Sequence, residues 1–171
     1  MRPCLAVAVA LAAALSACGP DWREYRSDAG NYAVELPDGP RAEREYKDGG
    51  RAVHLVHVEI DTNTAYGVSW FDVAKPEKLP AELLADVQAK VLRDLKAGLA
   101  DAGEIKLGGR PDGAPGRFFT ARTGAGVNVA IRLYAVGTGP VRVYQLIAAV
   151  PDLGRADRDI KRFFGSFKLL K

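Results

Sequence analysis

The clearest hydrophobic pattern in the chain lies at residues 127–150. Apolar and polar positions alternate through 127–136, and a second run rich in β-branched and aromatic residues fills 141–150. A Gly-Thr-Gly-Pro sequence at 137–140 separates the two runs. The pattern predicts two strands joined by a tight turn, and the other elements flank or cover this hairpin.

The length of that turn decides which side chains share a face. If the loop holds an even number of residues, Leu133 lies opposite Tyr144, and one face of the hairpin is almost wholly apolar. The other face then carries Arg132, Tyr134 and Gln145. A change of one residue in loop length would swap the faces of the second strand.

Several other stretches have the alternation or the composition of strands. They are 31–36, 52–60, 64–73, 104–107 and 117–123. Residues 41–47 are too charged to bury, so an edge strand or an extended loop is expected there. The glycine-rich stretch 108–116 lacks the Gly-Lys-Ser/Thr ending of a phosphate loop and leads into a strand, which predicts a turn-rich connection.

The segment that begins at Pro80 has the spacing of an amphipathic helix. Proline suits the first helical position because its missing N–H is not needed there. Apolar residues recur every three or four positions from Leu84 to Leu99, which predicts a helix of about twenty residues. Gly103 follows as a stop signal.

The C-terminal segment predicts a second helix. After Pro151, apolar residues from Leu153 to Phe164 form a stripe, and Phe167 and Leu169 are expected to dock on the core. Strands followed by helices in this order predict an α+β fold, an antiparallel β-sheet covered by two helices. The chain length favours one domain, at residues 30–171.

Residues 1–17 have the features of a secretory signal. Arg2 supplies positive charge, and the apolar run 5–15 is shorter than the roughly 20 residues that span a bilayer. The sequence Leu-Ser-Ala-Cys that ends at Cys18 resembles the lipobox of bacterial lipoproteins, in which the cysteine is acylated after cleavage just before it. We therefore expect a signal peptide at 1–17 and an acylated Cys18 at the start of a short tether, 18–29.

The cysteine count favours acylation over a disulfide. Cys4, the other cysteine, lies inside the segment that would be removed. Two or more acyl chains give durable membrane attachment. The alternative is an ordinary signal peptide, which would leave Cys18 as a free thiol. Gly19 is not the aspartate that commonly retains lipoproteins at the inner membrane, so we expect the outer membrane, facing the periplasm, in a Gram-negative cell.

Charge and candidate chemistry narrow the function further. The 24 basic and 21 acidic residues are interspersed, with a net charge of +3, so no nucleic-acid partner is expected.

His54 and His57 are three apart in a predicted strand and point to opposite faces, so we expect no metal site and no cofactor. None of the serines beyond the signal, including Ser69, lies in a Gly-x-Ser-x-Gly elbow, and Ser69 is expected simply to face a neighbour.

The order of elements comes with a set of short motifs. They are Gly-Asn-Tyr-x-Val-x-Leu-Pro at 30–37, Gly-Gly-x-Pro at 108–111, Arg-x-Tyr-x-Val-Gly at 132–137, Val-Tyr-Gln-Leu at 143–146 and Phe-Phe-Gly-Ser-Phe-Lys-Leu at 163–169. This pattern resembles the PsbP-like fold, shared by an extrinsic photosystem subunit, a Ran-binding import factor and many uncharacterised bacterial lipoproteins. The resemblance implies an antiparallel sheet covered by helices and a binding or assembly role, and it brings no catalytic residues.

One face of the predicted sheet is a candidate binding site. With a two-residue turn at 125–126, Arg117 lies opposite Tyr134, and Gln145 lies opposite Arg132. Arginine and tyrosine are enriched in binding hot spots, so these four residues are candidates for contact with a partner. The alternative is that a helix covers this face and the arginines reach past it to solvent.

These observations predict a membrane-anchored envelope lipoprotein that acts without catalysis, as a binding or assembly module for a protein or envelope component. Two alternatives stay open. A carrier of a small apolar ligand would need a large enclosed pocket between sheet and helix. An unrecognised hydrolase would need convergent polar groups with perturbed pKa values.

Overall fold

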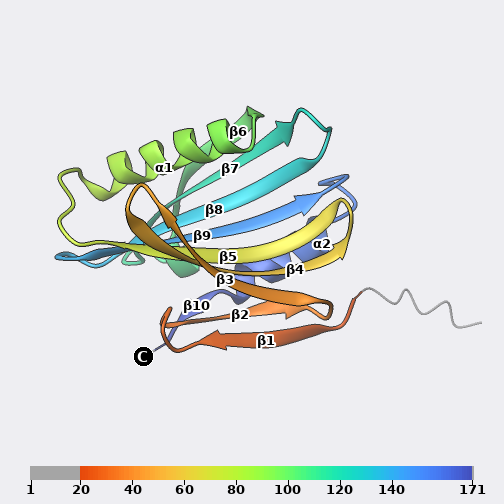
Figure 1. Ribbon diagram of the computed structural model, residues 1–171, viewed down its shortest axis with the longest axis horizontal. Coiled ribbons are helices and arrows are strands. Elements are labelled where there is room, and N and C mark those ends of the chain that lie inside the picture. Colours follow the sequence, from red (N-terminus) through yellow and green to blue (C-terminus); the bar gives the residue numbers. More distant parts are fainter. Residues whose placement is uncertain (1–19, 171) are drawn as a thin grey trace, which may run out of the picture.

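The computed structural model describes residues 20–170, which form two antiparallel sheets and two α-helices (Figure 1). The larger sheet has seven strands in the order β3 (Arg41–Asp48), β4 (Arg51–Asp61), β5 (Thr64–Val73), β9 (Val141–Val150), β8 (Asn128–Val136), β7 (Pro115–Thr123) and β6 (Ala97–Lys106). The smaller sheet has the order β1 (Trp22–Ser27), β2 (Tyr32–Pro37) and β10 (Lys168–Leu169). The helices are α1 (Pro80–Asp94) and α2 (Asp157–Ser166). The predicted α+β class, with an antiparallel sheet and two helices, is confirmed.

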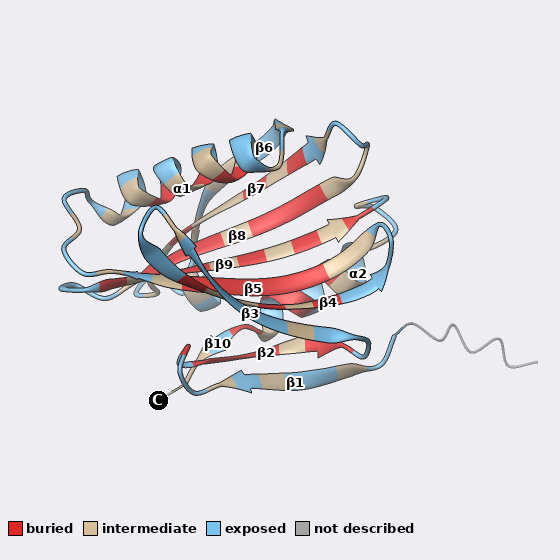
Figure 2. Cartoon of the chain, in the orientation of Figure 1, coloured by how far each residue is buried: buried red, intermediate tan, exposed pale blue. Residues whose placement is uncertain are grey.

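The seven-stranded sheet separates two hydrophobic cores. On one face, α1 packs on the inner strands through Leu84 and Val91. On the other face, α2 and the smaller sheet pack together, with Phe163 and Tyr32 at the centre of the second core. Figure 2 shows long buried stretches along β5 and β8, whereas β1 and β3 carry no buried residue. Residues 41–48 form the edge strand β3, as predicted.

The central hairpin β8–β9 differs by one residue from the predicted register. Leu133 pairs with Gln145 instead of Tyr144, and Tyr134 pairs with Tyr144. The prediction of an even loop was wrong because Val136 pairs with Arg142, which leaves the five residues 137–141 between them, with Gly137 at a φ of +112°. Every side chain of β9 therefore lies on the face opposite to the predicted one.

The turn between β7 and β8 is also longer than predicted. The N–H of Gly126 donates to the carbonyl oxygen of Thr123, and the N–H of Thr123 donates to the carbonyl oxygen of Val127, each at 2.9 Å. These bonds enclose residues 124–126 as a three-residue loop. Gly126 has a φ of +83°, as the last position of such a loop requires. Arg117 therefore pairs with Leu133 and not with Tyr134.

Helix α1 begins at Pro80, as predicted, but ends earlier than expected. The helix stops at Asp94, and Lys96 adopts a left-handed φ of +48° just after it. Residues 97–106 then form the edge strand β6 instead of a last helical turn followed by a short strand. Leu99, predicted to extend the apolar stripe, is 50% exposed on β6. Pairing with β7 satisfies the outer edge of that strand, which a longer helix would leave unpaired, and its register shifts between Leu99 and Asp101.

The C-terminal segment docks on the core as predicted. Ile160, Phe163 and Phe164 of α2 are buried, and so is Phe167 just beyond the helix. The strand β10 then pairs with β2, so the last described residues complete the smaller sheet.

The folded domain starts earlier than the predicted boundary at residue 30. Strand β1 pairs with β2 from Trp22 to Ser27, within the stretch that the sequence assigned to the tether. The ring of Trp22 packs edge-on against Tyr66 with centroids 5.3 Å apart, and Arg162 of α2 lies over the same ring. These long-range contacts order a segment in which half of the residues from 22 to 27 are charged.

Candidate binding clefts

The four residues predicted as one partner-binding site lie on two faces of the large sheet. Arg132 and Tyr134 share the face that α2 and the smaller sheet cover. Arg117 and Gln145 both pair with Leu133, which faces α1, and they lie on that opposite face. The prediction of a single face was wrong because both turns that set the register are one residue longer than assumed.

Three of these residues nevertheless line one cleft, of about 770 Å³, which we call the edge cleft. It lies where β6 and β8 end and β7 begins, the left-hand end of the sheet in Figure 1. Its walls come from the first turn of α1, the 3₁₀ turn Leu107–Gly109 after β6, and the C-terminal end of α2. Arg117, Arg132 and Tyr134 contribute to it, whereas Gln145 does not.

Arg132 is held against the aromatic wall of the edge cleft. Its guanidinium carbon lies 4.7 Å from the ring centroid of Phe164 on α2, a cation–π contact. Burial raises the pKa of the neighbouring Tyr134 hydroxyl, and the positive charge of Arg132 opposes that rise. The side chain of Arg132 is therefore half-buried and fixed in place by neutral aromatic groups. One alternative from the sequence was that a helix covers this face of the sheet. Helix α2 does cover it, but the guanidinium of Arg132 still borders the edge cleft.

Arg117 also has a neutral partner. Its Nε donates a hydrogen bond to the amide oxygen of Gln88 on α1. Gln88 is only 7% exposed, although it lies within the apolar stripe of the helix. The sequence analysis did not select Gln88. The sign that could have identified it is a polar residue at a position where the helical spacing of Leu84 and Val91 predicts an apolar one.

The positive charges of the edge cleft are poorly compensated. Within residues 20–170, Lys106, Arg117 and Arg132 form no salt bridge, whereas Arg110 at the same cleft pairs with Asp112 at 3.1 Å. Glu104 lines the cleft and is the cross-strand neighbour of Arg117, yet the guanidinium bonds Gln88 instead. Partly buried charge without a counter-ion is costly, so the cleft favours an anionic group.

Gln145 lines a second cleft, of about 320 Å³, between α1 and the β3–β4 hairpin. We call it the helix cleft. Ser69 also lines it and is the cross-strand neighbour of Gln145. The expectation that Ser69 simply faces a neighbour was incomplete, because its hydroxyl also borders this cleft.

The two histidines lie on opposite faces of β4, as their spacing predicts. His54 stacks on Trp70 with ring centroids 3.9 Å apart. His57 pairs with Gly67, and its Nε2 lies 3.3 Å from Glu59. In the part of the chain that the structure describes, no cluster of three or more histidine, cysteine or acidic side chains is placed to hold a metal ion.

The predicted acylation site, Cys18, lies outside the described residues. Neither α1 nor α2 is long and apolar enough to cross a membrane, and the search for such helices covered residues 20–170.

Comparison with known proteins identifies the fold. No family model matches the sequence, and no curated protein does either. Among solved structures, the solution structure of cyanobacterial PsbP (CyanoP) from Synechocystis sp. PCC 6803 superposes with a TM-score of 0.60. The match covers 91% of this chain and 98% of that one, with 16% sequence identity. The chain has a PsbP-like fold.

The PsbP-like fold accounts for the sheet and its helices, but not for the two clefts. At 16% identity the likeness concerns the backbone arrangement alone. The edge cleft and the helix cleft are therefore interpreted from the side chains of this chain.

Proposed function

We propose that this chain is an envelope lipoprotein, anchored through acyl groups on Cys18, whose PsbP-like domain acts without catalysis as a binding module. The observation that carries the binding role is the pair of half-buried arginines in the edge cleft, Arg117 and Arg132, whose partners are neutral. Their partner is a protein or envelope component that presents an anionic group beside apolar surface. Ile105 and Leu107 supply the apolar part of the cleft wall.

The position of the edge cleft suits a tethered module. Strand β1 begins at the right-hand end of the molecule in Figure 1, a few residues after Cys18, while the edge cleft lies at the left-hand end. A short tether would keep the domain close to the membrane surface, with the edge cleft turned away from the attachment point. The absence of an inner-membrane retention aspartate at Gly19 supports the outer membrane in a Gram-negative cell.

The anchor is tested by membrane fractionation. Cys18→Ala should shift the protein from the membrane fraction to the soluble fraction, because one acyl chain or more is lost. Cys4→Ala is the matched control, since that cysteine lies in the segment to be removed and should leave the distribution unchanged. Intact mass of the wild-type protein should exceed its polypeptide mass by the acyl groups. A mature protein of unmodified mass in the soluble fraction would contradict the anchor.

The binding role is tested by crosslinking in whole cells. A photoreactive amino acid at the exposed, cleft-lining position Pro111 should capture a partner, and the yield should fall at least about tenfold when Arg117 and Arg132 are both changed to glutamine. Lysine at both positions keeps the charge and should retain much of the yield, as should glutamine at the exposed Arg122. Capture should weaken as salt rises. Capture by the glutamine variant at the wild-type yield would contradict the proposal.

A further inference from the structure

Two polar side chains lie side by side beneath α1, on an otherwise largely apolar part of the sheet. Ser69 of β5 and Gln145 of β9 are cross-strand neighbours, and Ser69 is only 7% exposed. The adjacent positions on this face include Val143 and Leu133, both fully buried. Polar groups at such positions have to be satisfied or they destabilise the fold.

Neither side chain has a hydrogen-bond partner in the part of the chain that the structure describes. Among residues 20–170, the hydroxyl of Ser69 and the amide of Gln145 form no hydrogen bond, although other polar groups of the interior do, as Tyr144 donates to the carbonyl of Gly30 at 2.7 Å. Both side chains instead border the helix cleft. The Ser69 hydroxyl opens onto the cleft, where a molecule from outside can complete its hydrogen bonds.

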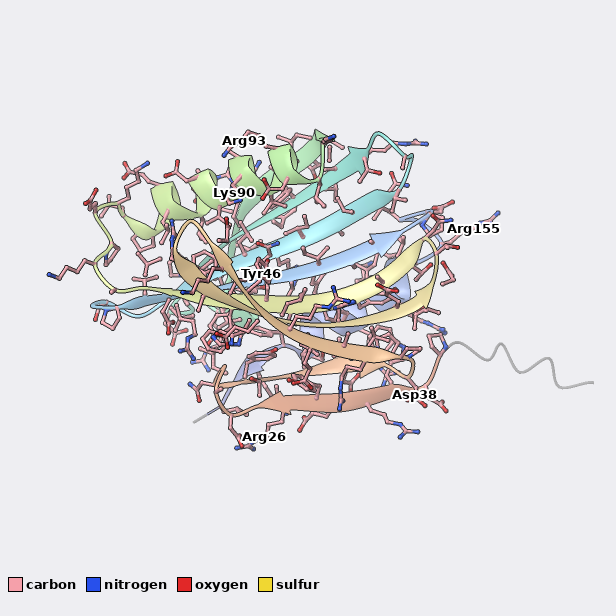
Figure 3. All side chains as sticks on the ribbon, in the orientation of Figure 1. Arg26, Asp38, Tyr46, Lys90, Arg93 and Arg155 are labelled. Carbon is pink, nitrogen blue, oxygen red and sulfur yellow. The ribbon has the colours of Figure 1, made fainter. Side chains whose placement is uncertain are left out.

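The rim of the helix cleft is charged and only partly neutralised, because Arg51 and Arg93 line it and form no salt bridge among residues 20–170. Lys90 of α1 contacts Asp94 at 2.6 Å and Asp48 of the β3–β4 hairpin at 3.3 Å, which ties the helix to the hairpin. Tyr46 lies on the hairpin strand and is 49% exposed. Figure 3 shows Lys90 on α1 and Tyr46 on β3, where these two elements approach each other.

The walls below this rim are mostly apolar. They are formed by Val53, Phe71, Leu83, Val87 and Val91. A ligand in the helix cleft would therefore pack its carbon atoms on these walls and direct its polar group at the floor.

We propose that the helix cleft binds a small neutral molecule, no larger than a single sugar ring, through an amide or hydroxyl group that bonds Ser69 and Gln145. A hydroxyl and a primary amide each donate and accept, so together they match a neutral group that does the same. A charged group would meet no counter-charge at this floor, because Ser69 and Gln145 are both neutral. The cavity of about 320 Å³ lies at the lower end of the range for ligand sites, about 300–1,000 Å³.

The proposal concerns a site separate from the edge cleft and does not depend on the anchor. The purified protein is titrated with N-acetylglucosamine, glucose and acetamide, and with acetate as the charged counterpart of acetamide, and amide chemical shifts are recorded. We expect at least one neutral probe to bind in the millimolar range and to shift resonances of β5, β9 and α1. Changing Ser69 to alanine and Gln145 to leucine together should weaken that binding at least about tenfold.

Stability measured on the same variants separates a ligand site from a structural polar pair. Because the two groups have no hydrogen-bond partner among residues 20–170, the double variant should melt at the same temperature as wild type or higher. Ser27→Ala, on the smaller sheet, is the control that should leave binding unchanged. The proposal is overturned if no neutral probe binds, if acetate binds better than acetamide, if the double variant binds equally well, or if that variant is clearly less stable.

Discussion

Arg142 of β9 and Asp72 of β5 are cross-strand neighbours joined by two parallel hydrogen bonds, of 2.7 Å from Nε and 2.8 Å from Nη2. The same guanidinium lies 4.1 Å from the ring centroid of Trp70 and donates to the carbonyl oxygen of Ala29 at 2.8 Å. Arg142 therefore connects the turn between β1 and β2 to the centre of the large sheet. A two-pronged bond of this kind is the strong form of an ion pair.

Because of the Arg142–Asp72 pair, part of the free energy of unfolding should depend on pH in the acid range. The hydrogen bond from Arg142 lowers the pKa of Asp72 below its ordinary value of 3.8. The contribution of the carboxylate is thus fully present above that value and is lost as the pH falls through the lower, folded-state pKa. Asp72→Asn should reduce the free energy of unfolding at neutral pH, and its difference from wild type should shrink in acid.

Urea unfolding measured at neutral pH and at a series of acid pH values checks this prediction. Asp38→Asn is the control, because the Arg23–Asp38 pair is largely exposed, at 75% and 53%, and should contribute little. A difference between Asp72→Asn and wild type that stays constant down to strongly acid pH would contradict the assignment.

The C-terminal aromatic residues should be important for folding. Phe163 is fully buried and Phe167 is 6% exposed, with rings against Tyr66 and Tyr144 respectively. Either substitution by alanine should cost about 3–5 kcal/mol of unfolding free energy. Leu79→Ala, at a position 70% exposed, should change it by less than about 0.5 kcal/mol. Unchanged melting of both phenylalanine variants would show that the tail does not dock.

The turn of the central hairpin contains two glycines, Gly137 and Gly139, at which alanine should have different effects on stability. An alanine Cβ at Gly137 would lie 2.4 Å from the carbonyl oxygen of Pro140, at a φ of +112°. An alanine Cβ at Gly139, two residues away, would meet nothing within 4 Å. Gly137→Ala should destabilise the protein by more than about 1 kcal/mol, and Gly139→Ala should be nearly neutral in the same chemical denaturation experiment. Equal effects would contradict the turn conformation and, with it, the register of β9.

The hydrogen bond between Arg117 and Gln88 predicts a coupled pair. Gln88→Leu should cost about 1–3 kcal/mol, because it leaves the half-buried guanidinium without its acceptor. Adding Arg117→Met should recover much of that loss, since both polar groups are then replaced by apolar ones. A double-mutant cycle by urea unfolding measures the coupling. Additive single effects would show that the two side chains do not interact.

Local patterns in the sequence determined the identity of most elements. Alternation located the strands, and Pro80 marked the start of α1. The stripe from Leu153 to Phe164 identified α2, although the helix begins only at Asp157. Each of these signals depends on residues within a few positions of each other, so no knowledge of distant contacts is needed. The resemblance to the PsbP-like fold depended on the order of these elements together with short motifs such as Phe-Phe-Gly-Ser-Phe-Lys-Leu at 163–169.

The end of α1 shows the limit of such signals. Leu95 and Leu99 have helical spacing, yet Leu99 lies on β6, because the pairing of residues 97–106 with β7 overrides the local pattern. The strand at Trp22 was missed for a related reason. Half of its residues are charged, and it is ordered by contacts with β2 and α2.

The candidate sites depended on tertiary structure almost entirely. Sequence alone selected Arg117, Arg132, Tyr134 and Gln145 for their chemistry, but their faces follow from two turns whose lengths alternation does not specify. Since side chains alternate with a period of two, one extra residue at each turn moved Arg117 and Gln145 to the face of α1. Only the folded chain then brought Arg117 to Gln88, and Gln145 to Ser69, because these pairs lie far apart in sequence and meet through the packing of α1 and β5 on the sheet.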